Sequence, residues 1–230
     1  MYFRHTSEIW TDYPELVAGV LRADGITADA GASPHVAKFN TIAETRLATS
    51  SEGELPEIQA WRRTFARMGL KPTQYRCASE ALLRRFRKEG SLPSIHPLID
   101  LCNAVSLAFA IPVAALDTSR IDEFLEVRPA TGAELYAAFS GATETPEAGE
   151  VIFVDGAANA HARRWTNRQS ALSAVRPETR SVLIVAEAMH PSAHEDVEQL
   201  LAALAFEIEA IWSITPAQRI LSRRSPQFDF

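Results

Sequence analysis

Apolar residues recur at helical spacing in four stretches of the chain. The spacing predicts helices over residues 55–68, 77–88, 97–109 and 192–213. Proline stands in the first turn of the first and third of these helices, where its missing N–H removes no hydrogen bond. In the second helix the pattern turns Phe86 toward the core and pairs Glu80 with Arg84 on the outer face, at i,i+4 spacing.

Shorter apolar runs outside these helices predict β-strands. The runs cover residues 2–10, 16–21, 112–116, 125–128, 151–154, 162–165 and 182–186. Those at 151–154 and 182–186 contain no polar residue, which indicates central strands covered on both faces. Helices come first, strands follow and a helix closes the chain, so we expect an α+β fold in which helices pack on a mixed, largely antiparallel sheet.

Length and composition fit one globular domain. The 230 residues are 47% apolar and 23% charged, an ordinary soluble composition, and we expect a single domain over 1–230 with N-terminal strands and a helix within 1–70. The longest weakly polar run, 104–116, is too short to span a bilayer. The first residues have neither the basic nor the apolar segment of a secretory signal, so we expect a cytoplasmic protein.

Basic residues are concentrated in one part of an acidic chain. The net charge is −6, yet residues 62–88 carry +8 and the rest of the chain carries −14. A basic segment on an acidic body can hold a phosphate backbone, through interactions that salt weakens. The alternative is a solvated helix face without a ligand.

Several familiar sites are absent. The chain has no GxGxxG, GxxxxGK[ST], HExxH or GxSxG motif, so the dinucleotide, P-loop and zinc-protease signatures are missing and a serine-hydrolase interpretation is weakened. Cys77 and Cys102 are spaced like neither a zinc site nor a redox pair, and we interpret them as reduced core thiols. Pro191 lies between His190 and His194, which we interpret as surface histidines. We expect no metal and no cofactor.

Two polar features stand beside the predicted core. Asp100 and Asn103 share one flank of the helix at 97–109, where such a pair either fixes a neighbouring loop or lines a pocket. Glu187 directly follows the apolar run 182–186, and a carboxylate at the end of a buried strand is often placed in a pocket. The alternative for Glu187 is a surface position at the strand end.

Six segments form a series that is specific as a whole. They are YRCASEALLRR (75–85), PSIHPLIDLCNAVSL (93–107), IPVAALD (111–117), GEVIFVDG (149–156), RRWTNRQS (163–170) and PETRSVLIVAEA (177–188). In this order, over 73–189, they resemble the B3/B4 domain of the phenylalanyl-tRNA synthetase beta subunit. The likeness is greater to the freestanding proteins that consist of that domain alone.

The resemblance implies an editing site. In the synthetase this domain hydrolyses the ester of tyrosine wrongly attached to the phenylalanine tRNA, and a glutamate on a strand that follows a threonine reads the tyrosine hydroxyl. Thr179 and Glu187 match that segment, Asp100 and Asn103 match the helix motif, and Ala114 replaces the family's histidine.

The candidate site residues follow from this match. Those implied for catalysis are Glu187, Asn103 and Asp100. Those implied for substrate binding are Thr179, Ala114, Ser79 and Trp165, the last of which is also available to stack on a base. The candidates for RNA binding come from the charge pattern instead: Arg76, Arg84 and Arg85 of the basic segment, and Arg163, Arg164 and Arg168, with a surface or structural ion pair as the alternative for each.

The implied activity is that of a freestanding tRNA-editing domain, an aminoacyl-tRNA deacylase that acts in trans and serves translation fidelity. An aminoacyl ester is already activated, so its hydrolysis needs a positioned water and a stabilised oxyanion more than a strong base. Class II synthetase motifs are absent, so we expect no amino-acid activation with ATP. The expected partners are the charged 3′ end of tRNA and its aminoacyl group, with no membrane and no DNA.

Two alternatives belong to other functional classes. One is a non-catalytic module that binds tRNA or an amino acid on the same fold. The other is an enzyme that acts on a small molecule on the same scaffold, for which added tRNA would have no effect on amino-acid binding.

Overall fold

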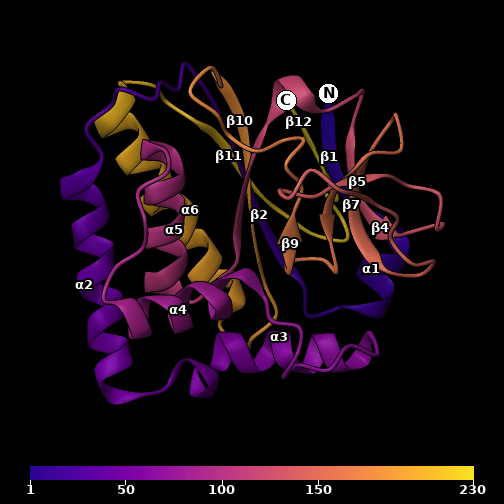
Figure 1. The fold of residues 1–230 in the computed structure, drawn as a ribbon, viewed down its shortest axis with the longest axis horizontal. Helices are drawn as coiled ribbons and strands as arrows, with labels where there is room; N and C mark the ends of the chain where they lie inside the picture. The colour runs from indigo at the N-terminus through magenta and orange to yellow at the C-terminus, as the bar shows by residue number, and fades with distance from the viewer.

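Two β-sheets face one another across a buried core, and helices cover the outer face of one of them (Figure 1). The computed structural model describes all 230 residues. The α-helices are α1 (Ser7–Asp12), α2 (Ser33–Thr49), α3 (Pro56–Arg67), α4 (Ala78–Glu89), α5 (Pro97–Phe109) and α6 (Ala193–Trp212), and the short 3₁₀ helices are η1 (Glu52–Glu54) and η2 (Thr118–Arg120). Helices α2, α5 and α6 form the covering layer, whereas α3 and α4 lie across one end of the sheets.

The strands form two main sheets and a small hairpin. They are β1 (Tyr2–His5), β2 (Val17–Asp24), β3 (Val113–Asp117), β4 (Leu125–Pro129), β5 (Tyr136–Ala137), β6 (Thr143–Glu144), β7 (Val151–Asp155), β8 (Ala160–Arg163), β9 (Arg168–Gln169), β10 (Ser181–Ala188), β11 (Ala217–Leu221) and β12 (Gln227–Asp229). The smaller main sheet is antiparallel throughout, in the order β11-β2-β10-β3. The larger has the order β12-β1-β4-β7-β8-β9, in which only β1 and β4 run parallel. Strands β5 and β6 pair only with each other.

Strand β10 separates the two parts of the hydrophobic core. Leu183 and Val185 pack with side chains of the larger sheet, whereas Val182 and Ile184 pack with the covering helices. Successive side chains of a strand point to opposite faces, so Glu187 shares the face of Val185. This alternation brings a carboxylate into the space between the two sheets.

The sequence predicted this architecture correctly. The fold is α+β, and the helices expected at 55–68, 77–88, 97–109 and 192–213 are α3, α4, α5 and α6. Strands β7 and β10 are central in their sheets, as their unbroken apolar runs indicated, and every residue of β7 is buried.

Two predicted strands have different bounds in the structure. The strand expected over 2–10 ends at His5 and is followed by α1, in which the neighbours Ile9 and Trp10 are both buried, a pattern that a strand covered on one face does not allow. The strand expected over 162–165 is β8, and Arg164 and Trp165 form a turn beyond it with positive φ.

Helices α4 and α2 also differ from expectation. Glu80 is fully buried and accepts hydrogen bonds from Arg62 instead of pairing with Arg84 on the outer face. Helix α2 was not predicted, because only Phe39 and Ala43 of its residues are buried and the apolar spacing is correspondingly weak.

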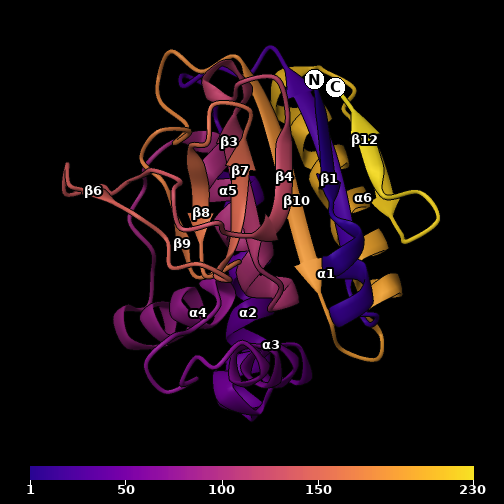
Figure 2. The same cartoon turned by 90° about the vertical axis from the view of Figure 1, so that its right-hand side faces the viewer.

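The two ends of the chain lie side by side (Figure 2). Strand β1 pairs antiparallel with β12, with Tyr2 opposite Asp229, and the Phe230 N–H donates to the Met1 carbonyl. On its other edge β1 pairs with β4. The first strand, which carries His5, is therefore held from both sides.

Both cysteines are buried and unpaired, as predicted. Burial raises the pKa of the Cys77 thiol to about 11 and that of the Cys102 thiol to about 12. None of the helices combines the length and the apolar character that crossing a membrane requires.

Candidate functional site

The centre of the candidate site is the buried carboxylate of Glu187 near the end of β10. His5 Nε2 lies 2.6 Å from Glu187 Oε1, and the Trp165 indole N–H donates to the same oxygen at 2.9 Å. The Trp61 indole N–H donates to the Glu187 backbone carbonyl at 3.2 Å. Oε2 makes no hydrogen bond within the protein. Two donors thus hold one carboxylate oxygen and leave the other available to a ligand.

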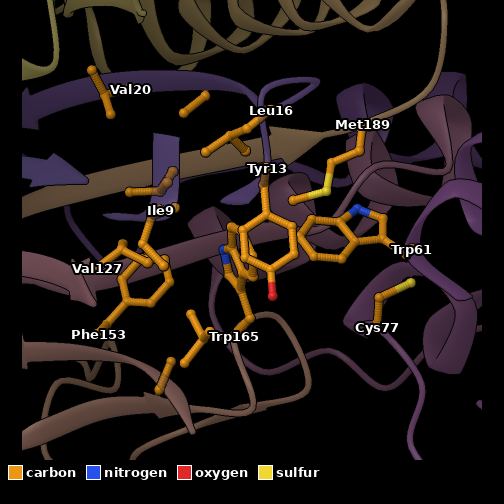
Figure 3. Close-up of a cluster of buried hydrophobic side chains, with 14 of the residues drawn as sticks. Ile9, Tyr13, Leu16, Val20, Trp61, Cys77, Val127, Phe153, Trp165 and Met189 are labelled. Atoms are coloured by element: carbon orange, nitrogen blue, oxygen red, sulfur yellow. The ribbon is translucent and has the colours of Figure 1, made fainter. Parts of the chain in front are cut away.

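Aromatic side chains from distant parts of the chain gather around Trp165, which bonds this carboxylate; Figure 3 shows Tyr13 and Trp61 beside Trp165. The ring of Trp165 meets those of Tyr13 and Trp61 edge to face, with centroid separations of 4.8 and 5.3 Å. Trp10 packs in the same way on His5, at 5.2 Å. Because both indole N–H groups that bond Glu187 belong to fully buried rings, water does not compete for these hydrogen bonds.

A small pocket of about 60 Å³ opens beside Glu187, between the edges of the two sheets. Its apolar lining consists of Ala78, Pro112, Val113, Ala114, Phe153, Ala162, Trp165 and Val185, and its polar lining consists of Thr166, Asn167, Arg168, Gln169 and Glu187. Gln169 joins the two sides of the pocket, because its amide donates to the Ala115 carbonyl on β3.

The turn after β8 aims Trp165 at Glu187. Arg164 and Trp165 have φ values of +48° and +58°, a left-handed conformation that costs a non-glycine residue about 1–3 kcal/mol. Hydrogen bonds hold the turn: the Trp165 N–H donates to the Val151 carbonyl at 2.7 Å, and the Arg164 N–H donates to Glu150 Oε1 at 3.0 Å. Backbone strain of this kind is concentrated at ligand sites, where the surrounding structure supports it.

Thr166 is a second polar residue of the pocket lining, and its buried hydroxyl has no partner. In contrast, the side-chain amides of Asn167 and Gln169 already donate hydrogen bonds to the backbone carbonyls of Arg76 and Ala115, respectively. A buried hydroxyl without a partner costs about 1–3 kcal/mol, so Thr166 and Glu187 are the two groups from which a bound ligand would gain most.

The family of the chain is decided by comparison with known proteins. A family model described as the B3/4 domain matches residues 60–201. The chain belongs to the B3/4 domain family. The matched range contains Trp61, the pocket and Glu187 of this B3/4 domain but not β1, which carries His5.

Among solved structures, this B3/4 domain is similar to an N-terminal fragment of the phenylalanyl-tRNA synthetase beta subunit from Pyrococcus horikoshii. The TM-score is 0.43 and the identity is 10%, and the match covers 87% of this chain and 48% of the fragment. The chain therefore spans about half the length of that fragment. No curated protein matches the sequence.

Two of the predicted substrate-binding residues, Ala114 and Trp165, line the pocket with Glu187. Thr179 lies toward the other end of β10, where its hydroxyl donates to Asp117 Oδ2 at 2.7 Å. Ser79 is buried beside Cys77, outside the pocket lining. The structure therefore brings together Glu187, Ala114 and Trp165, three of the seven residues predicted for catalysis and substrate binding.

Asp100 and Asn103 line a different hollow. It measures about 290 Å³ and lies between α2 and α5, on the helical side of the smaller sheet. Asp100 accepts hydrogen bonds from the Ser94 hydroxyl at 2.5 Å and from the Ile95 N–H at 2.8 Å. Asp100 thus fixes the loop before α5, and both residues line a hollow, but the structure does not bring them to Glu187.

Of the predicted RNA-binding arginines, Arg168 lines the pocket, whereas Arg164 and Arg76 lie next to lining residues. Arg164 forms no ion pair, and its guanidinium lies over the Tyr75 ring, 4.7 Å from the centroid. Arg168 lines the pocket and forms an ion pair with Glu144 at 3.0 Å. The Arg76 carbonyl accepts a hydrogen bond from Asn167 of the pocket lining, and the Arg76 guanidinium forms an ion pair with the buried Glu80 at 3.3 Å.

The other three are committed to acidic neighbours. Arg163 is buried and bonds both Glu144 and Glu150. Burial opposes ionisation of Glu150, but the Arg163 guanidinium more than offsets it and holds the pKa of that carboxyl below its usual value. Arg84 and Arg85 lie on α4, C-terminal to Ala78, the α4 residue that lines the pocket. Arg84 forms an ion pair with Glu52, and Arg85 forms one with Glu89.

One group of side chains has the composition of a metal site. Glu57, His190 and Asp196 each place a possible ligand atom within 4.8 Å of the other two. Arg46 already donates to Glu57 at 2.6 Å, and His190 Nε2 lies 2.7 Å from Asp196 Oδ2, so both carboxylates have partners without an ion. His190 is buried, contrary to the prediction of a surface position, because this contact draws it against α6, whereas His194 is exposed as predicted.

Sequence reasoning missed His5, Trp61 and Thr166. His5 lies 182 positions from Glu187, so no local pattern could join the two. Trp61 was predicted to lie on the apolar face of a helix, and it is buried there. Its indole N–H also donates a hydrogen bond to the Glu187 backbone carbonyl, which the sequence did not indicate. Thr166 lay inside the family segment at 163–170, which was the one available signal.

Proposed function

We propose that this B3/4 domain hydrolyses the ester of a misacylated aminoacyl-tRNA in trans. The observation that carries the proposal is the carboxylate of Glu187, which is fixed through one oxygen and offers the other to a small pocket. A carboxylate held in this way accepts a hydrogen bond from an aminoacyl group in one orientation only. The resemblance to the editing domain of the phenylalanyl-tRNA synthetase beta subunit supplies the class of reaction.

In the proposed reaction, water attacks the ester carbonyl carbon and the ribose hydroxyl of the terminal nucleotide leaves, which gives the free amino acid and tRNA. Glu187 and Thr166 hold the amino acid, so that the ester carbonyl always meets the same environment. Such positioning supplies much of the rate in reactions of activated esters. The neighbouring ribose hydroxyl or the substrate ammonium orients the water, since Ala114 stands in place of the family's histidine.

The tRNA end is proposed to lie across the mouth of the pocket, where it meets Arg164 and Arg168. Arg164 has no carboxylate partner to displace, and Arg168 is 41% exposed at its side chain. Trp165 is fully buried and bonds Glu187, so base stacking is left to other groups. Phosphate contacts by these two arginines imply binding that weakens as salt rises.

The second candidate function is a binding module without catalysis. The observation in its favour is that Glu187 and Arg168 are the only ionisable side chains that line the pocket. A site with one carboxylate and no histidine can hold an aminoacyl group or an amine without hydrolysing an ester.

Deacylation of a panel of mischarged tRNAs separates the two functions. The purified chain should release one or a few amino acids above the uncatalysed rate, and Glu187→Gln should abolish that release. Glu207→Gln is the matched control, because Glu207 is equally buried and also bonds a histidine, but lies on α6 away from the pocket. No release from any charged tRNA, together with binding of the charged end, would identify the binding module.

A further inference from the structure

We propose that the Glu187 pocket selects amino acids whose side chain is short and carries a hydrogen-bond donor, of the size of serine, threonine or cysteine. This inference rests on the function proposed above and goes beyond it by naming the substrate class. Two independent properties of the pocket lead to it: its volume, and the positions of its unpartnered polar atoms.

The volume limits the side chain. About 60 Å³ is available, and a water-sized group needs about 10–15 Å³ of such space, so the pocket holds roughly four to six non-hydrogen atoms. A hydroxymethyl or hydroxyethyl group fits within this number together with part of the amino-acid backbone. The phenol of tyrosine or the ring of phenylalanine exceeds it.

The walls do not give way easily. Ala78, Ala114 and Ala162 contribute only a methyl group each, so this apolar part of the wall has no flexible side chain that could swing aside. Phe153 and Trp165, which also line the pocket, are packed in the core between the sheets. Close-packed interiors resist expansion, so a larger ring would have to move the strands themselves.

The polar atoms define the chemistry of the side chain. Glu187 Oε2 can only accept a hydrogen bond when the carboxylate is ionised, whereas the unpartnered Thr166 hydroxyl can donate one. A ligand hydroxyl can donate to the first and accept from the second, which satisfies both. An alanine or valine side chain of similar size would leave both without a partner, and sites built to bond a hydroxyl reject such analogues strongly.

Two contrasts on one tRNA body test the proposal. The same tRNA is charged in turn with serine, alanine, threonine, valine and tyrosine, and the rate of deacylation is measured for each. Seryl and threonyl esters should be hydrolysed at least about 100-fold faster than alanyl and valyl esters, and tyrosyl ester should remain at the uncatalysed rate. Hydrolysis of tyrosyl ester at the seryl rate would overturn the size limit, and equal rates for seryl and alanyl esters would overturn the role of the donor.

Binding measurements keep this inference separate from the proposed hydrolysis. Adenosine analogues that carry serine, alanine or tyrosine through a non-hydrolysable 3′-amide can be titrated by calorimetry and by intrinsic tryptophan fluorescence. If no ester is hydrolysed but the seryl amide binds at least about tenfold better than the others, the hydrolase proposal fails and the selectivity stands. If no amide binds, or all bind alike, the selectivity fails as well.

Two variants localise the effect. Ala114→Leu should fill the pocket and abolish selection of the seryl compound, while Ala37→Leu, a matched change in the hollow that contains Asp100, should leave it intact. Thr166→Val should reduce the preference for serine over alanine by about tenfold while the fold is kept, as judged by circular dichroism and melting temperature. An unchanged preference in both Ala114→Leu and Thr166→Val would place the amino acid elsewhere.

Discussion

His5 Nε2 lies 2.6 Å from Glu187 Oε1, although 182 positions separate the two residues. Both side chains are buried, and neither has another ionisable partner within hydrogen-bonding distance. The orientation of the carboxylate at the end of β10 therefore depends on the first strand of the chain. Because β1 belongs to the larger sheet and β10 to the smaller, this contact also joins the two sheets.

Removing the imidazole should destabilise the fold and disorder the carboxylate. His5→Leu leaves a buried charge with one donor fewer, and breaking a buried pair in this way costs about 3–5 kcal/mol. His5→Gln can keep a donor toward Glu187 and should recover part of the loss. Urea unfolding of the two variants measures the difference.

His35→Leu, which removes the partly exposed histidine beside Glu207 but leaves Lys38 in place, is the control and should cost about 1 kcal/mol or less. Equal losses for His5→Leu and His5→Gln would mean that packing, not the hydrogen bond, is what His5 supplies.

Charge reversal near the pocket should weaken tRNA binding more than the same reversal on α4. Arg164 has no carboxylate partner, whereas Arg85 pairs with Glu89 at 2.8 Å. Arg164→Glu should reduce affinity for tRNA by about tenfold at low salt and make its salt dependence shallower, because one phosphate contact is lost. Arg85→Glu should change affinity by less than about threefold. Filter binding over a salt series checks both, and affinity that does not respond to salt would remove the arginines from the proposed interface.

Stability should fall in acid partly because of Glu134. Burial opposes ionisation of this carboxyl, but the N–H groups of the turn that begins at Thr131 and the Arg128 guanidinium more than offset it, and its pKa is lowered from the usual 4.5 to about 2. Since folding favours the ionised form, the stabilisation is complete above about pH 4.5 and is lost as the pH falls toward 2.

Glu134→Gln should therefore lower the free energy of unfolding at pH 7 by about 1.5–3 kcal/mol, and the difference from the parent should shrink between pH 4.5 and pH 2. Chemical denaturation at several pH values measures it. Glu198→Gln, at an exposed position on α6, is the control and should follow the parent throughout. A constant difference between Glu134→Gln and the parent would show that the carboxylate does not titrate as described.

The two thiols should be unreactive in the folded protein. Burial raises the pKa of Cys77 to about 11 and that of Cys102 to about 12, and only the thiolate attacks a disulfide reagent. Ellman's reagent at pH 8 should therefore modify neither cysteine until urea unfolds the chain, and then both. Rapid reaction of one thiol without unfolding would reveal local opening around it.

Patterns within a single element predicted the fold well and the site in part. The apolar spacing of 97–109 predicted a helix, because burial on one face of a helix leaves a periodic pattern of apolar residues. The unbroken apolar runs of β7 and β10 predicted strands, because strands covered on both faces are apolar throughout. The position of Glu187 after such a run correctly suggested a pocket. Glu80 was misplaced because its partner Arg62 comes from another helix, and His5 was missed because it lies on another sheet. Contacts between elements leave no periodic trace in either partner.

The pairing of β1 with β12 has a consequence for synthesis. A chain leaves the ribosome N-terminus first, so β1 emerges long before Glu187, and its neighbour β12 is made only after the strand that carries Glu187. The arginines beside the pocket mouth are already present on the nascent chain by residue 168. During translation the polypeptide thus acquires its proposed RNA contacts first and the carboxylate that reads the amino acid later. A partly made chain is expected to lack a working pocket until β10 has been made and Glu187 has met His5.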